Sequence, residues 1–196
     1  MPTSYYQSSI STFQNQSTEE IIGQITTSNQ FDSTRNQNKA WEQQINIPKK
    51  SLSAYSGTIF FEFSIPRMGK RVDAIVIIKN IVFVIEFKVG ETKFNRNDID
   101  QVWDYALDLK NFHQPSHHLV LAPILIATES HNSFFTLSTT SHNDNILNPI
   151  KIGKESIKEV IDQTLALFGD ESPINSQEYA EGSYSPTPTI IEATLS

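Results

Sequence analysis

The sequence contains no cysteine, which excludes disulfide bonds and thiolate metal sites. It has no apolar run long enough to span a bilayer, and its N-terminus lacks the basic and apolar regions of a signal peptide. No Gly-rich phosphate loop or Gly-x-Ser-x-Gly motif occurs, so the sequence does not support nucleotide hydrolysis. The five histidines show no zinc-type spacing. We therefore expect a cytoplasmic protein whose function does not depend on any of these sites.

Basic residues are too few to make the whole surface positive, because the formal net charge is −7. They are nevertheless concentrated: between Arg67 and Arg96, seven Lys or Arg residues stand against three Asp or Glu residues, a local charge of +4. Residues 170–196 carry five acids and no base. This pattern predicts a local, salt-sensitive phosphate-binding surface, and an ordinary solvated rim is the alternative.

The chain is organised around two β-branched runs in residues 69–90. Lys79-Asn80 is the only polar break between these runs. A two-residue connection there pairs Ile78 with Ile81 and sets the register of an antiparallel hairpin. Both faces of the hairpin are largely apolar, so we expect it at the centre of a sheet that is covered on both sides.

Four charged residues interrupt this hairpin. The register places Asp73 opposite Glu86, and the alternation of side chains places Lys88 on the same face as Glu86, opposite Arg71. Two covered carboxylates with Cβ atoms roughly 5 Å apart repel each other unless a cation compensates them. A divalent metal would do so. Alternatively, Arg71 and Lys88 neutralise the pair in a salt-bridge cluster without metal.

The spacing of these residues resembles a known nuclease core. Asp73, thirteen positions ahead of Glu86-Phe87-Lys88, resembles the metal-binding motif of the PD-(D/E)XK nuclease superfamily, with Val72 in place of the usual Pro. The resemblance implies that Asp73 and Glu86 hold Mg²⁺ or Mn²⁺ and that Lys88 assists the attacking water. The implied function is metal-dependent hydrolysis of phosphodiester bonds.

A second motif lies downstream, where Gln101 and Tyr105 resemble the Gln-x-x-x-Tyr element of RecB-type nucleases. Residues i and i+4 share one face of a helix, so the amide and the hydroxyl can act together on one phosphate or base. With Arg71, they are expected to position nucleic acid, DNA ahead of RNA. The residues leave open the strand preference and whether cutting is internal or from an end.

The resemblance also implies a metal-supporting Glu from a helix that precedes the sheet. Glu42 is the candidate, in a helix expected from about Arg35 to Leu52. Glu20 could play the same part, in a helix opened by a Ser17 capping box. The alternative for Glu42 is a solvent-exposed position.

The remaining patterns predict the element order αβββαβ in a domain of the α/β (α+β mixed) class, with a central mixed sheet flanked by helices; the resemblance implies that this is a restriction-endonuclease-like core. A strand at 58–65 makes an antiparallel meander with the hairpin, and a helix from about residue 97 leads to a parallel strand at 119–127. Pro123 in that strand implies a bulge or an edge. Residues 134–137 are expected to form a short strand, and residues 156–168 a last helix.

We expect three segments: a polar segment with a short helix (1–34), the nuclease-like domain (35–169) and a linker-like tail (170–196). Residues 67–105, together with Pro-Thr-Pro-Thr-Ile-Ile-Glu-Ala in the tail, resemble the N-terminal nuclease-like domain of bacterial proteins that continue into a Schlafen-type helicase. The resemblance implies a helicase domain in a longer parent chain. Two other functions stay open: a nucleic-acid-binding module of the same fold without turnover, and a protein-interaction scaffold.

Overall fold

The computed structural model describes residues 3–29, 35–172 and 174–195. The strands are β1 (Tyr6–Ser9), β2 (Thr58–Ile65), β3 (Lys70–Ile78), β4 (Ile81–Lys88), β5 (Val120–Ala127) and β6 (Ile150–Ile152). The helices are α1 (Ile10–Asn15), α2 (Thr18–Ser28), α3 (Arg35–Ser51), α4 (Arg96–Phe112), α5 (Ile157–Phe168), α6 (Ser176–Glu181) and α7 (Pro188–Leu195). None of the helices in these ranges is both long and apolar enough to cross a bilayer.

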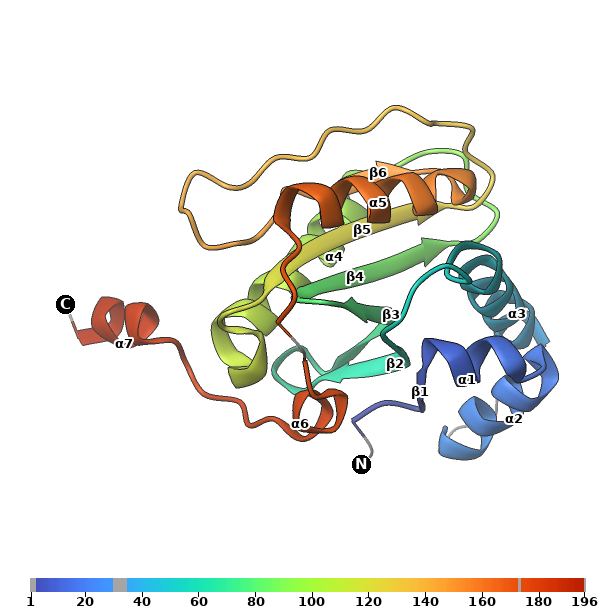
Figure 1. The fold of residues 1–196 in the computed structure, drawn as a ribbon, viewed down its shortest axis with the longest axis horizontal. Coiled ribbons are helices and arrows are strands. Elements are labelled where there is room, and N and C mark those ends of the chain that lie inside the picture. The colour runs from blue at the N-terminus through green and yellow to red at the C-terminus, as the bar shows by residue number, and fades with distance from the viewer. Residues whose placement is uncertain (1–2, 30–34, 173, 196) are drawn as a thin grey trace.

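The strands form one mixed sheet in sequence order from β1 to β6, with helices on both faces (Figure 1). Strands β1 to β4 pair antiparallel, and the β4/β5 and β5/β6 pairs are parallel. The succession α3, β2, β3, β4, α4, β5 confirms the predicted αβββαβ order and the mixed sheet.

The predicted hairpin register is confirmed. Ile78 pairs with Ile81 across the two-residue turn, and the ladder continues to Ala74 opposite Ile85. The turn requires a left-handed backbone at Lys79, whose φ is 53°. The next position along this ladder brings Asp73 and Glu86 to adjacent places on β3 and β4.

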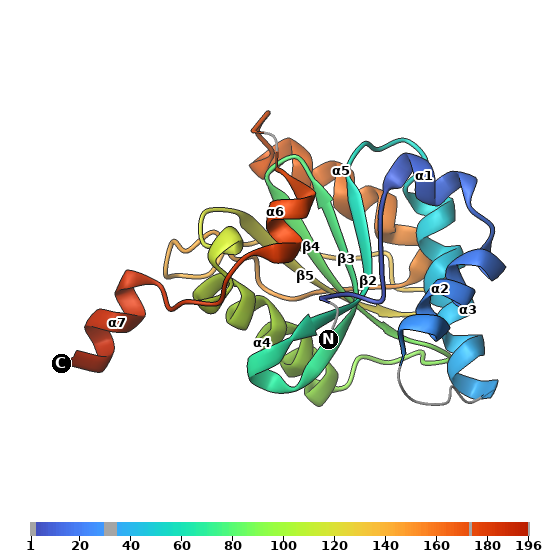
Figure 2. The same cartoon turned by 90° about the horizontal axis from the view of Figure 1, so that it is seen from below.

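Two apolar cores cover the hairpin, as the sequence predicted. Helices α1, α2, α3 and α5 pack on one face of the sheet, whereas α4 and α6 pack on the other (Figures 1 and 2). Side chains alternate between these cores along β3 and β4, so that Ile75 and Val84 lie under α4 whereas Val76 and Phe83 lie under α3 and α5. Both faces of the hairpin are therefore buried.

The structure differs from the sequence-based expectation in three strands. Residues 6–9 form the additional edge strand β1, inside the segment expected to be only polar and helical. Residues 134–137 form no strand; the last strand is β6 instead. Pro123 was expected to mark a bulge or an edge, but it lies inside β5. The β5/β6 pairing starts only at Ile124, so the missing N–H of Pro123 interrupts no hydrogen bond between these two strands.

Part of the tail is packed against the domain. The Tyr179 ring is buried against Phe63 and His113, and its hydroxyl is 2.9 Å from the Ser116 Oγ. Farther on, the Ser185 N–H donates to the Phe112 carbonyl at the end of α4. The linker-like composition of this segment therefore coexists with specific contacts, which the sequence analysis did not anticipate.

Candidate functional site

Three carboxylates lie at one level of the sheet, one on each of three adjacent strands. They are Glu62 on β2, Asp73 on β3 and Glu86 on β4, which we name the acid row. The β2/β3 register pairs Phe61 with Ala74 and Phe63 with Val72, so Glu62 and Asp73 occupy the places between these pairs. Adjacent strands thus bring together three acids that are far apart in the sequence.

Asp73 and Glu86 are locked together through main-chain hydrogen bonds. The Asp73 N–H donates to Glu86 Oε1, and the Phe87 N–H donates to Asp73 Oδ2, both at 2.9 Å. Each carboxylate thus satisfies a main-chain donor on the opposite strand. This exchange fixes both side chains in position, as a binding or catalytic site requires.

The surroundings of the acid row raise the pKa values of its carboxylates. Burial raises the pKa of Asp73 above its usual range, although the Phe87 N–H and the nearby Lys88 charge oppose this effect. Burial also raises the pKa of Glu86, and repulsion from Asp73 adds to it. Glu86 is only 5% exposed, so its ionised form is stabilised by few waters. A bound cation would relieve this cost.

The ammonium of Lys88 pairs with a different acid. Its Nζ lies 3.1 Å from Asp98 Oδ1 in the first turn of α4. The Arg71 guanidinium donates to the Glu62 carbonyl at 2.7 Å and lies over the Tyr5 ring, 4.0 Å from its centroid. The Lys88 charge nevertheless also lowers the pKa of Asp73 and of Glu86, so the alternative of a charge cluster without metal stays open.

Gln101 and Tyr105 are brought together on α4, as their spacing predicts. Gln101 Nε2 donates to the Tyr105 hydroxyl at 2.8 Å. Tyr105 is buried, and its pKa is raised by burial and by the Glu86 charge. The hydroxyl is therefore close to the acid row, whereas Gln101 is only half-buried.

Glu62 is the site residue that the sequence analysis missed. Its φ of 54° is a left-handed conformation, which for a non-Gly residue costs on the order of 1 kcal/mol or more. This residue breaks the alternation of β2, because Phe60 and Phe63 both pack under α4. The Glu62 carboxylate accepts the Trp41 Nε1–H at 3.1 Å. The sequence signal that could have identified Glu62 is its position as the single charged residue in the apolar run 59–63.

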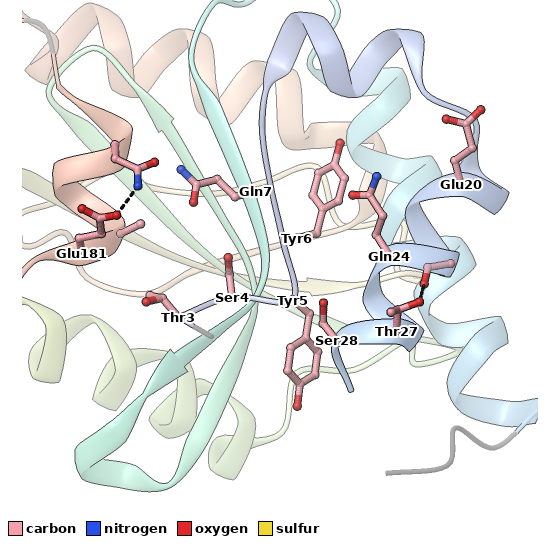
Figure 3. A pocket seen from close by; sticks show the side chains of 13 residues that line it. Thr3, Ser4, Tyr5, Tyr6, Gln7, Glu20, Gln24, Thr27, Ser28 and Glu181 are labelled. Carbon is pink, nitrogen blue, oxygen red and sulfur yellow. Dashed lines mark hydrogen bonds between the residues drawn. The ribbon is translucent and has the colours of Figure 1, made fainter. Parts of the chain in front are cut away.

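Neither expected supporting Glu is placed at the acid row. Glu42 is exposed on α3, and the α3 side chain that reaches the row is its neighbour Trp41. Glu20 lines a cavity of about 770 Å³ between β1, α2 and α6, opposite Glu181 (Figure 3). The expectation of a carboxylate from the preceding helices is therefore not met, and a strand residue, Glu62, is the third acid.

The acid row by itself is not a complete metal site. In the described ranges, no group of three or more His, Cys, Asp or Glu side chains has an arrangement that could hold a metal ion by itself. Asp73 and Glu86 nevertheless present two adjacent oxygen donors. Mg²⁺ is usually held by one or two carboxylates plus water and phosphate oxygens, so this pair suits it.

Burial and charge repulsion raise the pKa of Glu62 to about 7, with burial the larger cause. Because the folded protein then binds this proton more tightly than the unfolded chain, stability falls as pH rises from about 4.5 toward 7. We expect Glu62→Gln to remove this loss while keeping an acceptor for Trp41. In EDTA at pH 8, the variant should gain roughly 1–3 kcal/mol in unfolding free energy by urea denaturation, and the gain should vanish near pH 4.5.

Glu42→Gln is the matched control, because Glu42 is exposed on α3. Its stability should follow that of the wild type at each pH. Loss of stability in Glu62→Gln at every pH would show that the Glu62 charge is structural.

Comparison with known proteins gives no family for this chain. No family model matches it, and neither the curated proteins nor the solved structures contain a match.

Proposed function

We propose that this chain is a metal-dependent nuclease that hydrolyses phosphodiester bonds at the acid row. The interlocked pair of Asp73 and Glu86, with Lys88 on the same strand as Glu86, is the observation that carries the proposal. Mutual repulsion and burial make the pair costly without a cation. Mg²⁺ or Mn²⁺ held there would supply this positive charge and polarise a phosphate oxygen.

The side chains around the pair have distinct proposed roles. Lys88 is proposed to orient or deprotonate the attacking water and to stabilise developing negative charge, with Asp98 holding its ammonium in place. Glu62 is proposed as a positioning residue that connects the row to α3 through Trp41. Arg71 is proposed to bind a phosphate of the substrate on the β2 side of the acid row. Its guanidinium is held there by a hydrogen bond to the Glu62 carbonyl.

Nucleic acid is the proposed substrate, and a helicase domain in a longer parent chain is the proposed partner. The local charge of +4 between Arg67 and Arg96, the segment that contains Asp73, Glu86 and Lys88, supports a phosphate-bearing ligand. An inactive nucleic-acid-binding module would share this surface, so binding and cutting must be measured separately.

The pair on α4 provides a test of binding. Gln101→Ala and Tyr105→Phe should each weaken nucleic-acid affinity roughly three- to tenfold, the range of one neutral hydrogen bond. Fluorescence anisotropy of a labelled oligonucleotide in EDTA measures this without cleavage. Asp104→Asn, an exposed neighbour on α4, should bind as the wild type does. Unchanged affinity in both variants would remove this pair from the binding surface.

A further inference from the structure

A second candidate site, separate from the acid row, lies at the C-terminal end of β5. A cavity of about 620 Å³ opens between α3, the start of α5 and the residues that follow β5. Three lysines line it: Lys50 from α3, Lys154 just before α5, and Lys158 on α5. We name it the lysine cavity. Ile47 is its only apolar side chain, so the site suits a polar or charged ligand.

The lysine cavity lies at the same end of the sheet as Lys88. The parallel β4/β5 pair places Lys88 opposite Ala127, the last residue of β5. The Thr128 N–H then donates to the Lys88 carbonyl at 3.1 Å, and the next residue, Glu129, lines the cavity. Because α3 and α5 cover the face of the sheet opposite α4, a chain bound at the acid row would reach the cavity by passing around this end of the sheet.

Two lysines of the cavity are available to an anion. Lys50 and Lys154 have no ion-pair partner within the described part of the chain, whereas Lys158 pairs with Asp162 at 2.7 Å. Glu129 and Glu155 also lie on the wall, so that with Asp162 the acids equal the three lysines in number. The two unpaired ammonium groups are therefore the anchors for phosphate, and the glutamates can accept hydrogen bonds from base or sugar groups.

An exposed aromatic ring lies on a segment whose backbone is tied to the strand that leads into the cavity. Phe134 is 79% exposed, in the long segment between β5 and β6. Asn132 Nδ2 donates to the carbonyls of Phe134 (3.0 Å) and Lys151 (3.1 Å), and the Gly153 N–H donates to the Asn132 carbonyl. The backbone of Phe134 is thus tied to the segment that leads into Lys154. Aromatic rings next to cations are the usual platform for unpaired bases.

We propose that the lysine cavity and Phe134 bind one single-stranded segment of polynucleotide, with Lys50 and Lys154 on phosphates and Phe134 stacked on a base. The cavity has the volume of a small-ligand site, which suits a nucleotide or two and is too small for a duplex. This inference rests on the proposed function in one respect, since it takes the ligand to be the substrate strand.

The test is anisotropy of a short labelled single-stranded DNA in EDTA over a range of salt concentrations. The double variant Lys50→Gln with Lys154→Gln should make the slope of log affinity against log salt less negative by about 1.4, or about 0.7 per lost phosphate contact. Phe134→Ala should bind at least about fivefold more weakly with an unchanged slope.

Matched controls exist for both changes. Lys39→Gln alters an exposed lysine in the first turns of α3, and Leu167→Ala alters an exposed apolar residue near the end of α5. Both controls should bind as the wild type does, and all variants should melt at the wild-type temperature.

Three results would overturn the inference: wild-type affinity in the lysine and Phe134 variants, equal losses with duplex DNA, or full competition by a mononucleotide at equal concentration. Because no metal is present, the outcome is independent of cleavage. If the wild type cuts DNA but these variants bind normally, the inference fails and the proposed function stands. If the variants lose binding but no variant cuts, the binding site stands and hydrolysis fails.

Discussion

Asp73→Asn is expected to abolish Mg²⁺ and Mn²⁺ binding while leaving the metal-free protein as stable as the wild type or more stable. The Asn carbonyl can still accept the Phe87 N–H, so the hydrogen bond at 2.9 Å can persist. The substitution removes one of two repelling carboxylates, whose pKa values are raised by burial. Calorimetric titration measures the metal, and urea denaturation in EDTA measures the stability.

The change in stability of Asp73→Asn should depend on pH. A raised carboxyl pKa makes ionisation unfavourable in the folded state, so any gain from Asp73→Asn should be largest near pH 8 and absent near pH 4. A loss of about 2 kcal/mol or more at pH 8 would instead identify Asp73 as half of a structural ion pair.

Lys88→Ala is expected to slow cleavage by about 10²-fold or more while leaving metal affinity nearly unchanged. A protonated ammonium donates no lone pair to a metal, but it acts on water and on transition-state charge. Stability should fall by no more than about 1 kcal/mol, because the lost pair with Asp98 is partly exposed. Single-turnover cleavage at saturating Mn²⁺ separates this effect from binding.

Asp98→Asn complements this variant, because it removes the partner of Lys88 and leaves the ammonium. A smaller loss of rate than in Lys88→Ala is expected if Asp98 only positions Lys88. Wild-type cleavage by Lys88→Ala would remove Lys88 from the chemistry.

Local pattern was enough to predict the hairpin. The single polar break at Lys79-Asn80 admits one register, and a slip of one residue would move every side chain to the other face. That register carries Asp73 and Glu86 to adjacent positions, so the central part of the site followed from the sequence. The helix that carries Gln101 and Tyr105 followed equally well from its apolar periodicity.

The features that were missed depend on contacts between distant segments. Glu62 joins the acid row because β2 pairs with β3 and its own backbone is left-handed, and neither can be read from side-chain alternation. Tyr179 is buried because its ring packs against that of Phe63, which is far away in the sequence. The pairing of Lys88 with Asp98 depends on where α4 starts above β4, so hairpin geometry alone could not reveal this partner.

The most direct measurement is cleavage of labelled single- and double-stranded DNA and RNA by wild type and Asp73→Asn, purified side by side, with Mn²⁺ or with EDTA. We predict products from at least one substrate with wild type and Mn²⁺, and none with EDTA or with Asp73→Asn. Absence of products from all four substrates, or equal products from wild type and Asp73→Asn, would contradict this prediction.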